Sequence, residues 1–324
     1  MFQKNILPVF ANIDFEREPI CTSIQLESSL KRQVNEATLD GKAALMLSGG
    51  IDSAILAKYM PKGSVAYTLK CVVPGVEVID ESIAAARYAK ECGLDHKIIE
   101  IYWDDFINFA PKLMKRKGAP LHSIEVQIYK AALTAKDDGF TKLIFGENAD
   151  IIYGGFSGLL AHEWLVGDFV DRYSYVLPYK VLKESELILD PYKKHEHNGY
   201  IDVYDFLNDI FRLESCSSYA NACGLGEIEF VAPYSKTYLA TPLDYTRIRK
   251  GENKYLIRNL FSTLYSKYAI PDKTPMPRPT DEWLKTWEGP KRPEFWPHCT
   301  DGMTGDQKWL VYCLEWFLNI LDEN

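Results

Sequence analysis

The first half of the chain alternates short, apolar, β-rich runs with segments whose apolar residues recur at helical spacing. Four runs have the length and composition of buried strands: Ala43–Ser48, Ser64–Lys70, His96–Ile101 and Lys142–Gly146. Three helical patterns lie between them: Ser53–Met60, Glu81–Cys92 and Ser123–Asp138. Strands that alternate with helices form parallel β-α-β units. The alternation therefore predicts an α/β fold with a doubly wound, mainly parallel sheet.

The second half of the chain has a different pattern. After about Gly158 the strand-like runs become rare, and aromatic and Leu residues at helical spacing dominate Trp164–Leu187 and Val203–Leu213. We therefore expect a mainly helical C-terminal half that packs over the α/β half. The predicted organisation is an N-terminal extension and helix at 1–40, an α/β core at 41–158 and a helical region at 159–324.

Composition limits the kinds of protein that this chain can be. Hydrophobic residues make up 47% and charged residues 25% of the 324 positions, as in ordinary globular proteins. The net charge of -8 argues against a surface built to hold nucleic acid or an anionic membrane. The seven cysteines form no C-x-x-C pair, and Met1–Asn5 lacks the apolar region of a signal peptide. These features predict a soluble, cytoplasmic protein with no membrane partner.

The loop Ser48-Gly49-Gly50-Ile51-Asp52-Ser53 lies between the first predicted strand and the following helix. Two glycines allow the backbone to turn tightly and to bring N–H groups close to a phosphate. The hydroxyls of Ser48 and Ser53 can donate to further phosphate oxygens. Asp52 would repel a phosphate unless a divalent cation lies between them, so its presence implies Mg²⁺. The loop predicts a polyphosphate site with a bound metal ion.

This SGG-x-DS pattern resembles the pyrophosphate-binding loop of the ATP pyrophosphatase superfamily. That superfamily includes asparagine synthetase, argininosuccinate synthetase, GMP synthetase and several tRNA-modifying ligases. The resemblance implies an adenine nucleotide alpha hydrolase-like fold and ATP as the cofactor. It also implies cleavage of ATP between the α and β phosphates, adenylation of an oxygen and release of pyrophosphate.

A second motif, Gly146-Glu147-Asn148-Ala149-Asp150 and its continuation to Phe156, resembles the GEGADE-LFGGY signature of asparagine synthetases. The resemblance implies that Asp150 is the second Mg²⁺-binding aspartate, that Gly146 contacts the nucleotide and that Glu147 lies near the acid substrate and the adenylate. The motif departs from the signature at Asn148, which replaces a glycine, and at Ile151, which replaces a glutamate. An Asp-Ile pair resembles the β-lactam synthetases, although these carry tyrosine where Glu147 stands here.

Weaker matches extend the resemblance over about residues 25–290. They imply that the backbone near Leu69 contacts adenine, and that Lys254–Arg258 (KYLIR) corresponds to a K-x-x-L-R helix of the family. The segment from Lys273 to Pro279 resembles the R-P-K-x-G-F-x-x-P loop, which makes Lys273 a catalytic candidate that stabilises negative charge. Arg278 is an alternative cation from the same loop, and Glu214 is a candidate base for an attacking amine.

The resemblance implies a two-step reaction. ATP and a carboxylic acid, with aspartate as the first guess, give an acyl-adenylate and pyrophosphate; ammonia or an amine then forms an amide and releases AMP. Residues 1–42 precede the first predicted strand and position 2 is Phe2, so we expect no glutaminase domain. Ammonia would come from solution or from a separate partner.

Three alternatives stay open. The first is a related ligase with a natural-product acid and a larger amine, including ring closure within one substrate. The second is a tRNA-modifying enzyme, which the negative net charge and the lack of a recognisable RNA-binding appendage disfavour. One branch of the superfamily carries sulfur on paired cysteines, but we expect Cys216 and Cys223 to be buried or incidental, because neither has an adjacent basic residue. The third is a non-catalytic nucleotide-binding module, which the intact loop and both aspartates disfavour.

Overall fold

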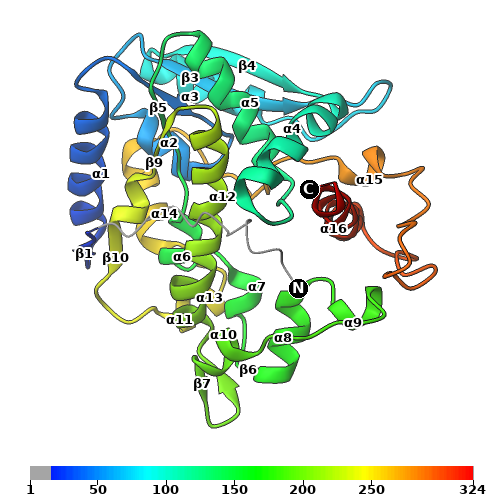
Figure 1. Cartoon of the computed structure of the whole chain (residues 1–324). Helices are drawn as coiled ribbons and strands as arrows, with labels where there is room; N and C mark the ends of the chain where they lie inside the picture. Colours follow the sequence, from blue (N-terminus) through cyan, green and yellow to red (C-terminus); the bar gives the residue numbers. More distant parts are fainter. Residues whose placement is uncertain (1–15, 324) are drawn as a thin grey trace.

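A computed structural model of the chain describes residues 16–323. Within these residues, the central sheet has five strands in the order β4-β3-β2-β5-β9, and every neighbouring pair is parallel. The strands are β2 (Ala43–Met46), β3 (Val65–Cys71), β4 (Asp95–Ile101), β5 (Lys142–Ile144) and β9 (Glu229–Val231). Helices cover the sheet (Figure 1). The prediction of a doubly wound, mainly parallel α/β fold is confirmed.

Strand β2 is buried on both faces because its side chains alternate between two hydrophobic cores. Ala43, Leu45 and Leu47 belong to one core, and Ala44 and Met46 belong to the other. Successive side chains of a strand point to opposite faces, so a strand covered on both sides needs a continuous apolar run. This requirement explains the run AALML in the sequence.

Each core is formed by the sheet and a layer of helices. One layer consists of α1 (Ser23–Thr38), α2 (Ile51–Ala57), α3 (Ser82–Cys92) and α14 (Tyr255–Leu264). The other consists of α4 (Trp103–Lys117), α5 (Ile124–Asp137), α12 (Arg212–Leu225) and α16 (Gly305–Asp322). Both layers therefore include helices from the second half of the chain.

The remaining elements of the second half are short. The helices are α6 (Ala149–Ile152), α7 (Ser157–Leu160), α8 (Val166–Ser174), α9 (Pro178–Val181), α10 (Asp190–Lys193), α11 (Val203–Phe206), α13 (Tyr245–Arg249) and α15 (Thr280–Trp283), with a π-helical turn at Leu207–Phe211 and a 3₁₀ turn at Pro233–Lys236. A small antiparallel sheet contains β6 (Trp164–Leu165), β8 (Tyr200–Ile201) and β7 (Glu196–His197). The segment from α7 to α11 forms the lower part of the view in Figure 1.

Two strands join distant parts of the chain. Strand β9 lies in the region expected to be helical, yet it pairs with β5 and completes the central sheet. Strand β1 (Glu18–Ile20) pairs in parallel with β10 (Thr237–Leu239) and so ties the N-terminal segment to the second half. Residues 1–15 of the predicted N-terminal extension lie outside the described residues.

The chain order reverses between β2 and β5. The chain passes from β2 to β3 and β4 on one side, and then returns to place β5 on the other side of β2. Ligands of open α/β sheets bind in the crevice outside the carboxyl ends of the strands at such a switch point. Both sequence motifs follow these two strands directly. Among the described residues, no helix combines the length and apolar character needed to cross a membrane.

Candidate active site

The loop after β2 is held by its own serines. Ser53 Oγ accepts a hydrogen bond from the Ser48 N–H at 3.0 Å and lies 3.0 Å from Ser48 Oγ. Ser48 Oγ accepts a further hydrogen bond from the Gly50 N–H at 3.2 Å. A Cβ at Gly49 would lie 3.1 Å from Ala84 Cβ, so the start of α3 packs closely behind the loop. The serines and glycines thus set the shape of the loop at the carboxyl end of β2.

A buried lysine lies between the two aspartates. Lys254 Nζ is 2.7 and 2.9 Å from the two Asp52 carboxylate oxygens and 3.0 Å from Asp150 Oδ1. The Lys254 side chain is only 8% exposed. The two carboxylates, which follow neighbouring strands, are therefore close enough to share one cation.

The three charged groups of this cluster respond differently to burial. Burial raises the pKa of Asp52 above its ordinary value; the charge of Lys254 offsets part of this rise and that of Asp150 adds to it. Burial alone would lower the pKa of Lys254, but the carboxylates of Asp52 and Asp150 raise it above its ordinary value. Burial likewise opposes ionisation of Asp150, but the charges of Lys254 and Lys273 hold its pKa below its usual range. The lysine therefore stays charged and holds the carboxylates in place.

The same carboxylates fit a magnesium ion. Within residues 16–323, no group of three or more His, Cys, Asp or Glu side chains is placed to hold a metal by itself. Mg²⁺ at phosphate sites is bound by one or two carboxylates together with substrate phosphates and water. The pair Asp52 and Asp150 provides hard oxygen ligands of this kind.

The side chain of Asp150 lies so close to Gly155 that only glycine fits at position 155. A Cβ at Gly155 would overlap Asp150 Oδ1. Asn148, which replaces a glycine of the family signature, has a φ of 68°, a left-handed conformation that asparagine adopts more readily than most residues. Ile151, the other departure, is buried in a hydrophobic core. Both departures therefore preserve the backbone that presents Asp150.

Lys273 contacts the carboxylate oxygen of Asp150 that Lys254 does not contact. Its Nζ is 3.2 Å from Asp150 Oδ2 and 4.9 Å from the centre of the Phe156 ring. Its side chain is 42% exposed, so it can reach a ligand in the adjoining cavity. The structure therefore places Lys273 next to Asp150 at the cavity.

Glu147 is held by two hydroxyl-bearing residues of α12. Ser215 Oγ donates a hydrogen bond to Glu147 Oε1 at 2.6 Å, and Tyr219 also donates to this carboxylate. Burial raises the pKa of Glu147 above its ordinary value, and these two hydrogen bonds offset part of the rise. The surroundings of Glu147 therefore favour its protonated form more than water does.

These residues surround one cavity of about 260 Å³. Nine of the residues named from the sequence line it: Ser48, Gly50, Asp52, Ser53, Leu69, Gly146, Glu147, Asp150 and Lys273. Gly49 lies in the loop but does not line the cavity. Apolar side chains complete part of the wall, among them Met46, Ile128 and Met276. The cavity thus has charged groups and an apolar surface, as a nucleotide site requires.

Among the lining residues that were not proposed as site residues from the sequence are Lys254, Arg258, Tyr219 and Glu81. Lys254 and Arg258 belong to the KYLIR segment, which resembles a helix of the family. We had assigned no role to its residues. Tyr219 and Glu81 also line the cavity, and no motif marked Tyr219. In contrast, Glu214 is exposed and accepts a hydrogen bond from Tyr173 at 3.2 Å outside the cavity lining.

The carboxyl group of Glu81, next to the Ser48–Ser53 loop, should make the stability of the protein depend on pH. Burial raises its pKa to about 7, although the Gly49 N–H donates to it. Because the folded state favours the protonated form, Glu81 stabilises the fold at low pH, and this contribution is lost as the pH rises through about 7. Glu81→Gln should therefore raise the melting temperature relative to the unsubstituted protein more at pH 8 than at pH 5. Thermal unfolding at both values measures this, with the exposed Glu36→Gln as the control; parallel curves would contradict it.

The fold and the cavity define a class: an α/β domain with a glycine-rich loop and paired aspartates at the switch point of a parallel sheet. The family model described as asparagine synthase matches residues 25–208. The chain belongs to the asparagine synthase family.

Individual relatives are more distant. A protein of Methanocaldococcus jannaschii named "Putative asparagine synthetase (glutamine-hydrolyzing) 1" is 29% identical over 141 residues, which cover 41% of this chain and 25% of that protein. The chain thus spans about a quarter of this curated relative.

Two solved structures are similar in part. An NH3-dependent NAD synthetase from Campylobacter jejuni is 15% identical, with 42% of this chain and 61% of that chain covered and a TM-score of 0.28. A U34-tRNA thiolase from Methanococcus maripaludis is 14% identical, with coverages of 76% and 82% and a TM-score of 0.26. Both scores are low, and the family assignment stands on the family model.

Proposed function

We propose that this protein is an ATP-dependent ligase that adenylates a carboxylic acid, releases pyrophosphate and then forms an amide with ammonia or an amine, releasing AMP. The observation that carries this proposal is the cavity at the switch point, where Asp52, Asp150, Lys273 and Glu147 converge from three separate segments. Family membership supports the same reaction class.

In the first step, the loop Ser48–Ser53 would hold the polyphosphate, and the apolar wall near Leu69 would hold the adenine. Asp52 and Asp150 are the residues that would hold Mg²⁺, which supplies charge neutralisation on the phosphates. The substrate carboxylate oxygen attacks the α-phosphorus, and the bond to the β-phosphate oxygen breaks. Lys273 stabilises the negative charge that develops on the phosphates.

In the second step, an amine attacks the acyl carbon and the bond to the AMP oxygen breaks. The new C–N bond leaves a proton on nitrogen that a base must accept. Glu147, held by Ser215 and Tyr219, lines the same cavity and is our candidate for this base. We propose Glu147 and Lys273 as the catalytic residues.

Aspartate is the first acid to test, because the M. jannaschii relative is named as an asparagine synthetase. Ammonia would come from solution or from a separate supplying partner. A cytoplasmic location is proposed because all seven cysteines are free thiols, which suits a reducing compartment. Residues 41–158 remain our proposed α/β core, with 159–324 completing the active site.

A pyrophosphate-release assay tests the proposal. The protein is incubated with Mg-ATP and a panel of acids that includes aspartate, with and without ammonium, and with Asp52→Ala and Lys273→Ala as controls. Release with aspartate and ammonium, together with AMP and asparagine, would identify an ammonia-dependent asparagine synthetase. Release with a different acid or amine would favour a natural-product amide ligase, for which the Asp150-Ile151 pair is the supporting observation. ATP binding without release on any acid would contradict the proposal.

The buried thiols of α12 argue against sulfur transfer. Burial raises the pKa of Cys216 to about 11 and raises that of Cys223 further, so neither forms a thiolate at neutral pH. A Cys216→Ala/Cys223→Ala variant should therefore keep its pyrophosphate-release rate within about threefold. It loses packing and the hydrogen bond from the Asn148 amide to Cys216 Sγ, but Asn148 keeps its hydrogen bond to Ser235 Oγ. Thermal unfolding of the same variant separates packing damage from a catalytic effect. A complete loss of activity in a folded variant would favour the tRNA-modifying alternative.

A further inference from the structure

The Lys273 loop has few hydrogen bonds of its own. It connects α14 to α15 and contains Pro271, Pro275, Pro277 and Pro279, which lack the backbone N–H donor. Its residues from Pro271 to Pro277, except Pro275, line the cavity. A loop of this composition must be positioned by contacts with the rest of the protein.

The C-terminal end of this loop is fixed to the sheet layer. The carbonyl of Pro277 accepts hydrogen bonds from the buried Gln127 side chain of α5 at 3.1 Å and from Cys71 Sγ at the end of β3 at 3.2 Å. These contacts hold the loop next to the cavity wall, but both of them restrain Pro277.

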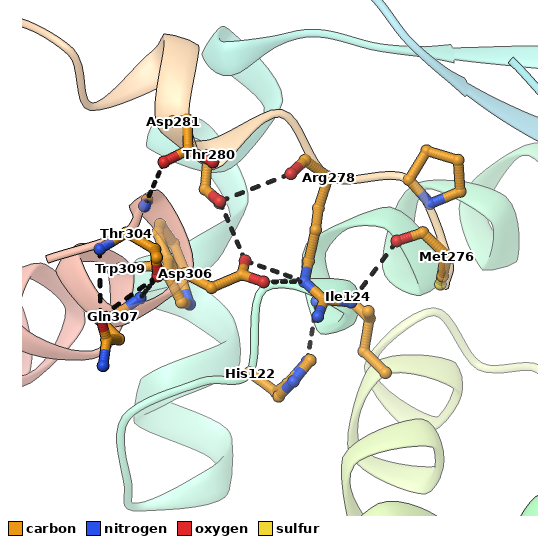
Figure 2. Close-up of polar contacts among 12 residues, drawn as sticks. His122, Ile124, Met276, Arg278, Thr280, Asp281, Thr304, Asp306, Gln307 and Trp309 are labelled. Carbon is orange, nitrogen blue, oxygen red and sulfur yellow. Dashed lines mark hydrogen bonds and ion pairs between the residues drawn. The ribbon is translucent and has the colours of Figure 1, made fainter. Parts of the chain in front are cut away.

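The next residue, Arg278, makes a two-point contact with α16. Its Nε lies 2.9 Å from both carboxylate oxygens of Asp306, and Thr280 Oγ1 donates to Asp306 Oδ1 at 2.9 Å (Figure 2). The Gly305 N–H donates to Asp281 at 2.5 Å, and a Cβ at Gly305 would overlap the backbone of Asp281. The start of α16 therefore packs directly on the segment that follows the loop.

Helix α16 is itself fixed in place near its N-terminal end. Thr304 and Gln307 form a capping box at its start, and the buried Trp309 donates from Nε1 to the Leu121 carbonyl at 2.9 Å. The neighbouring His122 stays neutral, because burial and the charge of Arg278 lower its pKa to about 4. Asp306 is therefore the charged partner of Arg278 at this point.

From this geometry we infer that the Arg278–Asp306 pair is a positioning device that holds Lys273 at the cavity, with α16 as its support. Arg278 acts through the loop and does not touch the phosphates. The inference rests on the proposed function in that Lys273 is the group being placed. It also assigns to the C-terminal helix a role in the reaction although α16 contributes no residue to the cavity lining.

Kinetics of Arg278→Gln, Asp306→Asn and the double variant test the inference. Each single variant should lower kcat for pyrophosphate release by about tenfold with little change in the KM for ATP, because misplacement of a charge-stabilising group acts on the transition state. The double variant should be no worse than either single variant, and Arg278→Lys should recover part of the rate. Arg292→Gln, which removes the ion pair to Asp322 on the same helix, is the control and should retain the rate.

Two results would overturn the inference. If Arg278 contacts the phosphates directly, Arg278→Gln will raise the KM for ATP while Asp306→Asn leaves the kinetics unchanged. If the pair is merely structural, Arg278→Gln will lower kcat equally in the unsubstituted protein and in a Lys273→Ala background; positioning predicts no further loss in that background.

A measurement independent of activity separates this inference from the proposed function. Hydrogen exchange of peptides covering 270–277 should be faster in Arg278→Gln and Asp306→Asn, and unchanged in Arg292→Gln. Unchanged exchange in the first two variants would refute the positioning device. Faster exchange in a protein that never releases pyrophosphate would retain the device and reject the proposed function.

Discussion

Asp52→Asn and Asp150→Asn are each expected to lower the rate of pyrophosphate release by about 1,000-fold, equivalent to about 4 kcal/mol in the activation free energy. Asparagine keeps the shape of the side chain but removes the negative charge that the metal and Lys254 require. Asp52 and Asp150 both contact the same lysine, Lys254, so neither aspartate can take over the role of the other.

Steady-state pyrophosphate release at saturating Mg-ATP checks this prediction. Asp40→Asn is the matched control, because Asp40 also pairs with a lysine, Lys142, at 2.8 Å, but at the amino ends of the same two strands. The control should retain the rate. A folded Asp52→Asn or Asp150→Asn protein with a rate within tenfold of the unsubstituted protein would refute the metal-binding assignment.

Lys254→Met should destabilise the protein by about 3 kcal/mol, because removal of one partner from a buried ion cluster leaves the others uncompensated. Two carboxylates would then repel each other without the ammonium between them. Mg²⁺ should restore part of the loss, so its addition should raise the melting temperature of Lys254→Met by more than that of the unsubstituted protein.

Thermal unfolding with and without Mg²⁺ measures both effects. The double variant Asp150→Asn/Lys254→Met should be more stable than Lys254→Met alone, since it removes one of the two repelling charges. Lys142→Met, which breaks the pair with Asp40 at the other end of the strands, should show no added response to Mg²⁺. An equal response in Lys254→Met and Lys142→Met would show that the paired aspartates do not attract the ion.

The sequence was informative about the centre of the site because that centre is local to two strand ends. The run AALML had to be buried on both faces, and the SGG-x-DS loop follows it directly. Asp150 follows the neighbouring strand, and parallel pairing of β2 with β5 brings the two motifs together. A pattern of this short range can be recognised in the sequence without knowledge of the rest of the fold.

The remainder depends on long-range packing that no local pattern carries. Lys254 reaches the aspartates from the start of α14, and Ser215 and Tyr219 reach Glu147 from one turn of α12. Strand β9 has three residues, too few for alternation to distinguish it from a loop. The sequence analysis named Arg278 as an alternative cation to Lys273, and the structure pairs it with Asp306 on the last helix.

Strand β9 also has a consequence for the order in which the protein can be made. A nascent chain that has emerged only as far as residue 158 has β5 as an open sheet edge, because its neighbour lies at 229–231. Exposed strand edges template pairing between chains. We therefore expect a fragment ending near residue 158 to aggregate when expressed alone, and the ribosome must deliver about 70 further residues before the sheet closes.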